Sequence, residues 1–508
     1  MLEAPSFHIL PALREYGGRE DRSSLLLLGL IGATVLVLPS LSLLPSLSPY
    51  NEKRVLQVGI LLVVGAVLVV SRTARQRWLS VFIRLPRLAQ WGLCTVLGLG
   101  LLSSALAPAP FYAFLEVGHF VLLFAAAGGV AMAVRQAPKR TERFILGAVT
   151  VSVLLYAVYF AVRYGGALAF PALEIGKETV GGFANTRFFN QYQTWTLPLL
   201  GGAVLALPKR WRAVRGGVLF LAGLWWTLIF ASNVRGTVVA MGIAAVGVRL
   251  LFRNHAHRWL SVQAMALLGG GVLYFFAFYL IGDAAPQFAA QMQQADGSSW
   301  RILRWLSCLQ LAGSHPWLGV GPMHFAWPPF HFEPGAHPHN AFLQWLVEWG
   351  VPSTVLMSGM IAWGGWRWIQ KENEEASTAS PRSNAIRVAL VASLLVGTAH
   401  AMVSGLLVMP VSQILLVLVG GWAWGRYQHD EDFTTARSSF RVQAIFCVLL
   451  VASIGIVGSS LQELSTVKER RSAFLETVER NKLSPRYWAQ GYIGVRDSTV
   501  LKRARRDR

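Results

Sequence analysis

Charged residues, and acidic ones above all, are scarce in this chain. Charged residues make up 14% of its 508 residues, with 25 Asp and Glu against 46 Lys and Arg. Hydrophobic residues reach 54%, and the mean hydropathy of +0.46 is too high for an ordinary soluble multidomain protein. The three cysteines are scattered at positions 94, 308 and 447, so no disulfide framework is indicated.

Long apolar runs recur along the whole chain. About 20 such residues at 1.5 Å rise cross the hydrocarbon core of a bilayer as a helix. We count about thirteen candidate spans, centred on 24–47, 55–71, 90–107, 111–134, 144–162, 190–207, 216–231, 236–252, 259–282, 341–366, 387–408, 410–425 and 442–460. The sequence therefore predicts an all-α polytopic membrane bundle. The pair 216–231 and 236–252 is short enough that a tilted or re-entrant arrangement stays open.

The basic residues gather in alternate loops, which argues against nucleic acid as the partner of a chain with net charge +21. The positive-inside rule makes these loops cytoplasmic. The chain then divides into a cytoplasmic segment 1–23, nine helices over 24–282, an outer loop 283–340, four helices over 341–460 and a basic tail 461–508, which also falls outside. Within the fourth of these parts, the polar stretch 371–384 is expected to be a cytoplasmic linker after the tenth helix.

The outer loop carries the chemistry-bearing motifs. Ser298–Leu306 predicts an amphipathic helix with Arg301 and Arg304 on one face, three residues apart. His315-Pro-Trp-Leu-Gly-Val-Gly321 follows and predicts a turn, since no strand precedes it as a dinucleotide loop would require. His337-Pro-His339-Asn340 comes next, before a helix that carries Glu348. On their own, the two arginines fit an interfacial lipid anchor as well as a binding site.

This ordered series of motifs resembles the O-antigen ligase and polymerase superfamily, whose members include O-antigen ligases, O-antigen polymerases and pilin-type O-oligosaccharyltransferases. The resemblance covers about 230–360. It extends to Arg235-Gly236, although two residues separate Arg235 from Ser232 where the family has Ser-Arg-Gly. It also extends to Asn185 and Asn190 as substrate-binding candidates, although Thr186–Phe189 depart from the family pattern.

The resemblance implies a membrane glycosyltransferase of the bacterial inner membrane. It would transfer a glycan from undecaprenyl diphosphate to an acceptor hydroxyl at the periplasmic face, without metal or other cofactor. Arg235, Arg301 and Arg304 are the candidate clamp for the diphosphate, because a guanidinium stays protonated and offers a fixed fork of donors. Stabilising the departing diphosphate electrostatically is a term that a preorganised site supplies strongly. Direct displacement would invert the anomeric centre.

A poor nucleophile such as an acceptor hydroxyl needs a base. His339 is the first candidate and His337 the second, since an imidazole that titrates near neutrality suits this role. Asn340 or Glu348 is expected to fix the orientation of His339. The acceptor stays open: lipid A–core or a protein Ser or Thr is favoured over a growing glycan, because the compact His-x-His-Asn loop resembles the ligases and O-oligosaccharyltransferases more than the polymerases.

Two other readings compete with a metal-free transferase. Five histidines gather in the outer loop beside Glu333, which would suit a metal site; they are His315, His324, His331, His337 and His339. Glu116, His119 and His400 lie within predicted spans, where burial is costly, so each is expected to pair or to line a cavity. A carrier of a lipid-linked sugar or an ion would also use such residues, but it would not need arginines and histidines collected in outer loops.

Overall fold

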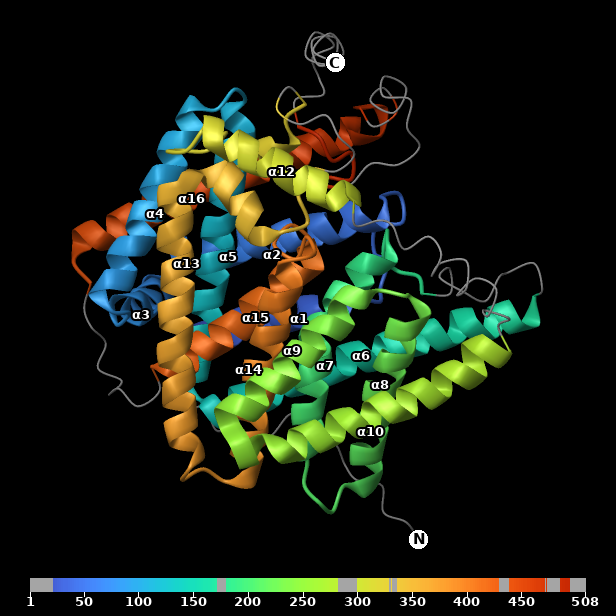
Figure 1. The fold of residues 1–508 in the computed structure, drawn as a ribbon. Coiled ribbons are helices and arrows are strands. Elements are labelled where there is room, and N and C mark those ends of the chain that lie inside the picture. Colours follow the sequence, from blue (N-terminus) through green and yellow to red (C-terminus); the bar gives the residue numbers. More distant parts are fainter. Residues whose placement is uncertain are drawn as a thin grey trace.

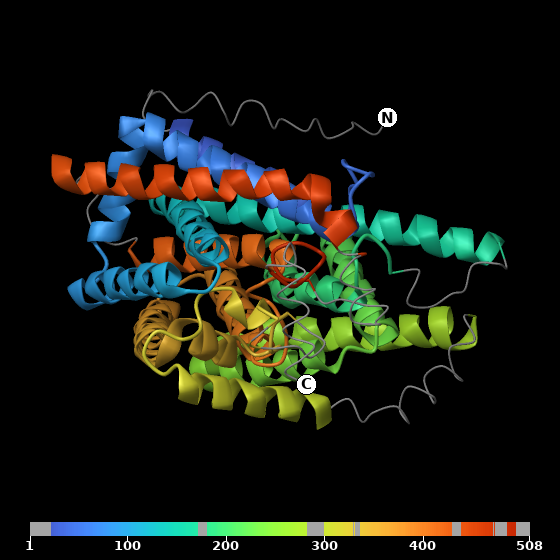
Figure 2. The same ribbon diagram turned by 90° about the horizontal axis from the view of Figure 1, so that it is seen from above.

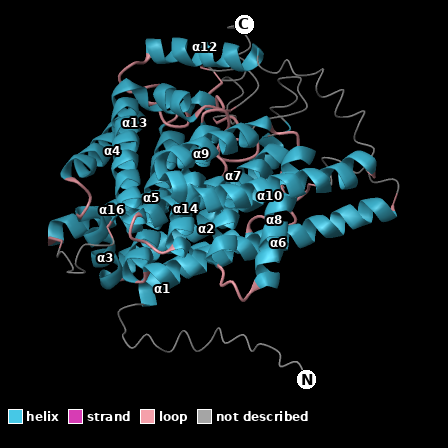
Figure 3. Cartoon of the chain, turned by 60° about the horizontal axis from the view of Figure 1, so that its bottom comes forward, coloured by secondary structure: helices cyan, strands magenta, loops and turns pink. Residues whose placement is uncertain are grey.

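The structure, a computed structural model, describes residues 22–170, 180–281, 299–328, 330, 336–428, 438–470, 472 and 485–493. Every regular element within these ranges is a helix and none is a strand (Figures 1 and 3). The all-α prediction is therefore confirmed. Eight described helices are long and apolar enough to cross a membrane, with two successive helices merged into one of the eight.

Each of the thirteen apolar runs contains a helix. These helices are α1 (Arg22–Val37), α2 (Pro49–Val70), α4 (Arg87–Leu106), α5 (Pro110–Gln136), α6 (Pro138–Ala169), α7 (Thr186–Ala206), α8 (Arg212–Ala231), α9 (Arg235–Phe252), α10 (His257–Tyr274), α13 (Ala341–Ala376), α14 (Pro381–Ala401), α15 (Pro410–Tyr427) and α16 (Phe440–Ser459). A π-helical turn, Phe275–Leu280, continues α10. Two more helices, α3 (Arg72–Ile83) and α12 (Ser299–Ser314), lie outside the predicted spans.

Four helices form the inside of the bundle, where α14 packs against α7 and α15 packs against α5. Helix α16 packs against α2 and α5 at one side (Figure 2). Helices at the periphery expose large apolar side chains, among them Leu250, Leu268 and Val448. So much exposed apolar surface suits contact with lipid and not with water.

Two predicted spans end earlier than expected. Helix α1 stops at Val37 instead of 47, because a residue before proline is pushed out of the helical region and Pro39 follows Leu38. Helix α14 stops at Ala401 instead of 408, and residues 402–409 run without regular structure to Pro410. Hydropathy does not register these breaks, since both segments are apolar.

Helices α8 and α9 are separate elements joined by a short turn. Asn233 adopts the left-handed region, with φ 48°, and breaks the helical path between them. Helix α8 packs against α10 and α7, whereas α9 packs against α14. The two helices therefore lie against different neighbours.

Segments that the sequence assigns to the outer side meet at one end of the bundle. Tyr50 packs against Phe188, and the pair lies in one apolar cluster with Val408, Met409 and Ala489. We call this end of the bundle the outer end; that it faces the periplasm stays a prediction.

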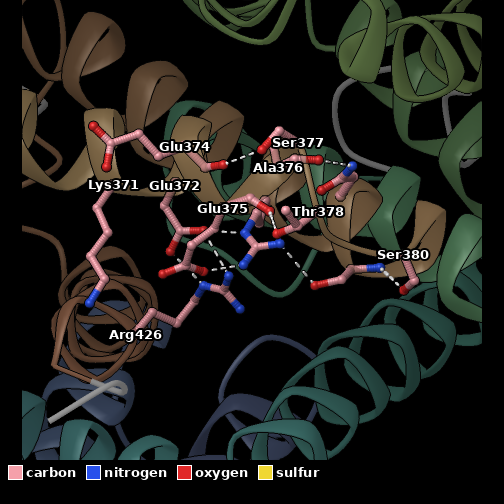
Figure 4. Close-up of polar contacts among 12 residues, drawn as sticks. Lys371, Glu372, Glu374, Glu375, Ala376, Ser377, Thr378, Ser380 and Arg426 are labelled. Carbon is pink, nitrogen blue, oxygen red and sulfur yellow. Dashed lines mark hydrogen bonds and ion pairs between the residues drawn. The ribbon is translucent and has the colours of Figure 1, made fainter.

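The opposite end is closed by a buried ion network (Figure 4). Arg426 at the end of α15 donates to Glu372 at 2.7 Å and pairs with Glu142 at the start of α6. Arg387 in α14 donates to Glu372 at 2.8 Å and pairs with Glu375. The expected linker 371–384 is therefore wrong as to its bounds: α13 continues to Ala376, where its glutamates meet these arginines, and α14 begins at Pro381, so the connection is residues 377–380.

We expect Arg426→Ala to lower the apparent Tm of the purified protein in detergent. Removing one partner of a buried ion pair leaves an uncompensated charge and costs about 3–5 kcal/mol. Arg441→Ala, at an exposed arginine of α16, is the matched control and should leave the Tm within about 1 °C, since exposed pairs are worth little. Equal melting of the two variants would contradict a stabilising role for the network.

Candidate functional site

Helix α12 lies over the outer end of α13 (Figure 1). Its inner face packs Cys308 and Ala312 against Val320, Phe325 and Val347, which are all buried. This confirms the predicted amphipathic helix. Arg304 is fully buried within this arrangement, and Arg301 is half-buried.

The His-Pro-x-x-Gly-x-Gly segment is a turn, as predicted, and it locks onto a break in α13. Val320 N–H donates to Val347 O at 2.8 Å, and Val351 N–H donates to Pro316 O at 2.8 Å. Gly350 has φ 77° inside α13, and a Cβ there would lie 2.5 Å from Trp317 O. Glycine is therefore required where the turn meets the helix.

The two motif histidines form one compact unit. Their ring centroids are 4.1 Å apart, and the His339 N–H donates to His337 Nδ1 at 3.3 Å. His339 has φ 57°, a conformation that persists in a non-glycine residue only when its surroundings fix it. Two contacts do so: Trp305 Nε1 donates to Pro338 O at 3.1 Å, and Asn340 Oδ1 caps α13 by accepting from Leu343 N–H at 2.9 Å.

The irregular segment after α14 forms the floor under His337. A Cβ at Gly405 would lie 2.5 Å from His337 Cε1, so the imidazole rests directly on this glycine. Ser404 accepts from Gln191 Nε2 at 2.9 Å, which ties the floor to α7. His400 lies below, bound to Thr194 Oγ1 at 2.7 Å, and its Nε2 would lie 2.9 Å from a Cβ at Gly236.

Asn185 and Asn190 both have structural contacts. Asn185 caps α7, since its Oδ1 accepts from Arg187 N–H at 2.8 Å. Asn190 is fully buried and donates to Ser232 Oγ at 2.7 Å, which joins α7 to the α8–α9 turn. These contacts hold the α8–α9 turn beside the floor of the site.

Arg235 is the first residue of α9 and lines a groove of about 330 Å³. Apolar side chains of α8 and α10, among them Phe230 and Tyr274, form the rest of its wall. Arg235 therefore stands where an apolar groove between helices meets the α8–α9 turn.

Positive charge converges on His339. Burial, and then the charges of Arg304, Arg301 and Arg187, lower the pKa of His339 to about 3. Burial and the neighbouring His339 hold the pKa of His337 well below its usual value. Burial and positive charge thus lower the pKa of His339 from the near-neutral value expected for it.

Glu348 holds the base of the loop. Its carboxylate accepts from Arg486 at 2.7 and 2.8 Å and from Phe325 N–H at 3.2 Å, and Gln344 lies beside it. Arg486 also binds Glu116, at 2.7 and 2.8 Å. The structure thus gives Glu348 a supporting place under the loop, in contrast to the expected orientation of the His339 ring.

The histidines beyond the His-x-His pair do not gather around a common point in the described residues. His324 uses both ring nitrogens, Nδ1 toward Pro322 O at 2.8 Å and Nε2 toward Ala109 N–H at 3.1 Å. His331 and Glu333 lie outside the described residues. Among those described, no three His, Cys, Asp or Glu side chains form a group that could hold a metal ion.

The polar residues predicted within the spans are paired, as expected. Glu116 binds Arg486, and His119 lies 3.3 Å from Arg54 and 3.2 Å from Gln413. Two charged residues near the site belong to no motif that would have indicated their part in it. Arg187 acts on His339 from the first turn of α7, and Arg486 comes from the tail, where only the neighbouring aromatic residues Tyr487 and Trp488 signalled burial.

A family model described as O-antigen ligase matches residues 217–358. The match spans α8 to the first half of α13 and so includes Arg235, Arg301, Arg304 and both motif histidines. The match supports a membrane glycosyltransferase of the O-antigen ligase and polymerase type. The match covers less than half of the chain and, over residues 217–358, supports the resemblance to the O-antigen ligase and polymerase superfamily. No curated protein matches the chain.

We expect Gly405→Ala to lower turnover about hundredfold, because the new methyl group displaces His337 and a shift of about 1 Å in a reacting group can cost that much. Glycan transfer by the purified variant measures the effect. Gly359→Ala in α13, where a Cβ meets no atom within 4 Å, is the matched control. Full activity in Gly405→Ala would show that the position of His337 does not matter.

Proposed function

We propose that this protein transfers a glycan from undecaprenyl diphosphate to an acceptor hydroxyl at the periplasmic face of the bacterial inner membrane. The observation that carries the proposal is the convergence of Arg301, Arg304 and Arg187 on a neutral His339. A dense positive field suits a diphosphate leaving group, and a neutral imidazole suits a base. The family match supports the same class of reaction.

The donor is held by charge at one end and by apolar contact at the other. Arg301 and Arg304 bind the diphosphate and stabilise the negative charge that grows on it as the glycosidic C–O bond breaks. Arg235 stands at the apolar groove between α8, α9 and α10, where a prenyl chain can lie against Phe230 and Tyr274 while its diphosphate turns toward the arginines.

His339 takes the proton of the acceptor hydroxyl as the new C–O bond forms. His337 accepts the backbone N–H of His339 and so fixes the loop in the left-handed conformation at that residue. Attack by the hydroxyl on the face opposite the diphosphate inverts the anomeric centre. The acceptor in this proposal is lipid A–core or a protein Ser or Thr, ahead of a growing glycan.

The direct test is a reconstitution of the purified protein with a lipid-linked glycan and each acceptor in turn. His339→Ala should lower kcat by roughly 10²–10⁴-fold, the range for lost general-base catalysis, and leave donor binding intact. Arg301→Lys should weaken donor binding, because a point charge replaces a fork. The control His257→Ala, at an exposed histidine of α10, should match the wild type. Loss of donor binding in His339→Ala would place that residue in the clamp.

The pH dependence should differ between the free enzyme and the donor complex. In the free enzyme the pKa of His339 is about 3, so kcat/KM should show no acid limb near pH 6.5 from this residue. Bound diphosphate offsets the arginine charges, which raises the pKa of His339 and makes the imidazole a stronger base. The acid limb of kcat should therefore lie at higher pH than that of kcat/KM. Identical profiles would contradict this coupling between donor and base.

A further inference from the structure

Residues 485–493, here called the tail segment, are buried against the outer end of the bundle (Figure 1). Arg486, Trp488 and Ile493 are each 3% exposed or less. Backbone groups of the segment bind α2: Tyr50 OH donates to Arg486 O at 2.6 Å, and Arg54 Nε donates to Tyr487 O at 3.1 Å. The tail segment is thus part of the packed bundle, although the tail around it is rich in basic residues.

The tail segment also reaches the outer loop. Ile493 N–H donates to Ala326 O at 3.1 Å. The guanidinium of Arg486 lies between Glu116 of α5 and Glu348 of α13, with each carboxylate at 2.7 Å from Nη2. The segment therefore links three parts of the chain that are otherwise distant in sequence: α2, α5 and the loop with α13.

From Glu348 the link continues to the histidines. Glu348 accepts from Phe325 N–H, and Val347 beside it accepts from Val320 N–H, so the carboxylate sits where α13 meets the turn. Helix α13 begins at Ala341, two residues after His339. A displacement of Glu348 would move this first part of α13 and, with it, the loop that ends in His339.

We propose that the tail segment is a strap that positions the catalytic loop, and that Arg486 is its positioning residue. The proposal rests on the proposed function of His339. Arg486 binds the paired carboxylates of Glu116 and Glu348 and so fixes α13 and the turn relative to the bundle. The charge of Arg486 also reaches His337 and His324, which agrees with its place beneath the loop.

The opposite role, a plug that must leave before substrate enters, conflicts with the same contacts. Departure would leave Glu116 and Glu348 facing each other without a counter-charge in a site that excludes water. Removing one partner of such a buried arrangement is strongly destabilising. The strap therefore stays in place during turnover.

Kinetics of Arg486→Ala and Arg486→Lys test the positioning role. The alanine variant should lose about hundredfold in kcat with donor KM within about twofold, since the loop shifts while the clamp keeps its charges. The lysine variant should recover part of kcat, because a cation again lies between the carboxylates. Lys468→Ala, at an exposed basic residue of the same tail, is the matched control and should be unchanged. Equal loss in donor KM and kcat, or no loss at all, would overturn the proposal.

A second readout needs no catalysis. Cys308, on the inner face of α12, is buried against Phe325 and Val347, so in a Cys94→Ser, Cys447→Ser background its maleimide reaction should be slow. We expect Arg486→Ala to speed this reaction at least tenfold and Lys468→Ala to leave it unchanged. An unchanged rate in Arg486→Ala would overturn the strap even if the protein proved to transfer no glycan. Absence of transfer in the wild type with normal Cys308 protection would instead sink the proposed function alone.

A disulfide cross-link distinguishes a strap from a plug. The variant carries Ala326→Cys and Ile493→Cys, with the native cysteines removed by Cys94→Ser, Cys308→Ala and Cys447→Ser. The two backbones are hydrogen-bonded to each other, so oxidation should link them, as mass spectrometry would verify. The oxidised protein should transfer glycan at the rate of its reduced form. Activity that disappears on oxidation and returns on reduction would show that the segment must leave, and would overturn the strap.

Discussion

Charges that leave water need partners, and this requirement shapes both ends of the bundle. At one end five charged side chains satisfy one another: Arg387 and Arg426 pair with Glu142, Glu372 and Glu375. A low dielectric strengthens each of these attractions and raises the penalty for breaking one. The result is a closed end in which α6, α13, α14 and α15 are held in register.

At the other end, arginines from α7 and α12 direct positive charge toward one loop. The same low dielectric that strengthens the ion network makes that field strong, and it keeps the two loop histidines neutral. Negative charge brought by a substrate is favoured there for the reason that glutamates are favoured at the opposite end. In the proposed function, binding of a negatively charged substrate near the start of α13 and pairing of the glutamates near its end both depend on strong electrostatic attraction in a low dielectric.

Local patterns in the sequence predicted the helices well, and they also predicted the structure of two loop segments. Apolar runs located the spans, the spacing of Arg301 and Arg304 predicted α12, and the glycines at 319 and 321 predicted the turn. The predicted C-terminal ends of α1 and α14 were wrong because apolar residues continue past the point where each helix stops. The consequence is larger at α14, because the irregular residues after it, which hydropathy had assigned to a helix, include Gly405. This glycine lies directly under His337.

Contacts between residues far apart in sequence were beyond the reach of such patterns. Glu348 and Arg486 are separated by 138 residues, and Glu116 and Arg486 by 370. Composition marked the tail 461–508 as basic, whereas the fold buries two of its arginines, Arg470 and Arg486. The family motif indicated Glu348 as a site residue, but no local pattern indicated Arg486 as its partner. The sequence therefore could not predict that Glu348 supports the loop through an ion pair.

The place of Arg486 in the chain has a consequence for biogenesis. A ribosome makes Glu116 and Glu348 before it makes the residue that binds them, and every helix that the structure describes precedes that residue. The ion pair is therefore formed last, whatever the order in which the helices assemble. Premature termination between residues 473 and 485 would yield a bundle with all the helices that the structure describes and all the loop motifs, yet without the guanidinium that joins its two buried carboxylates.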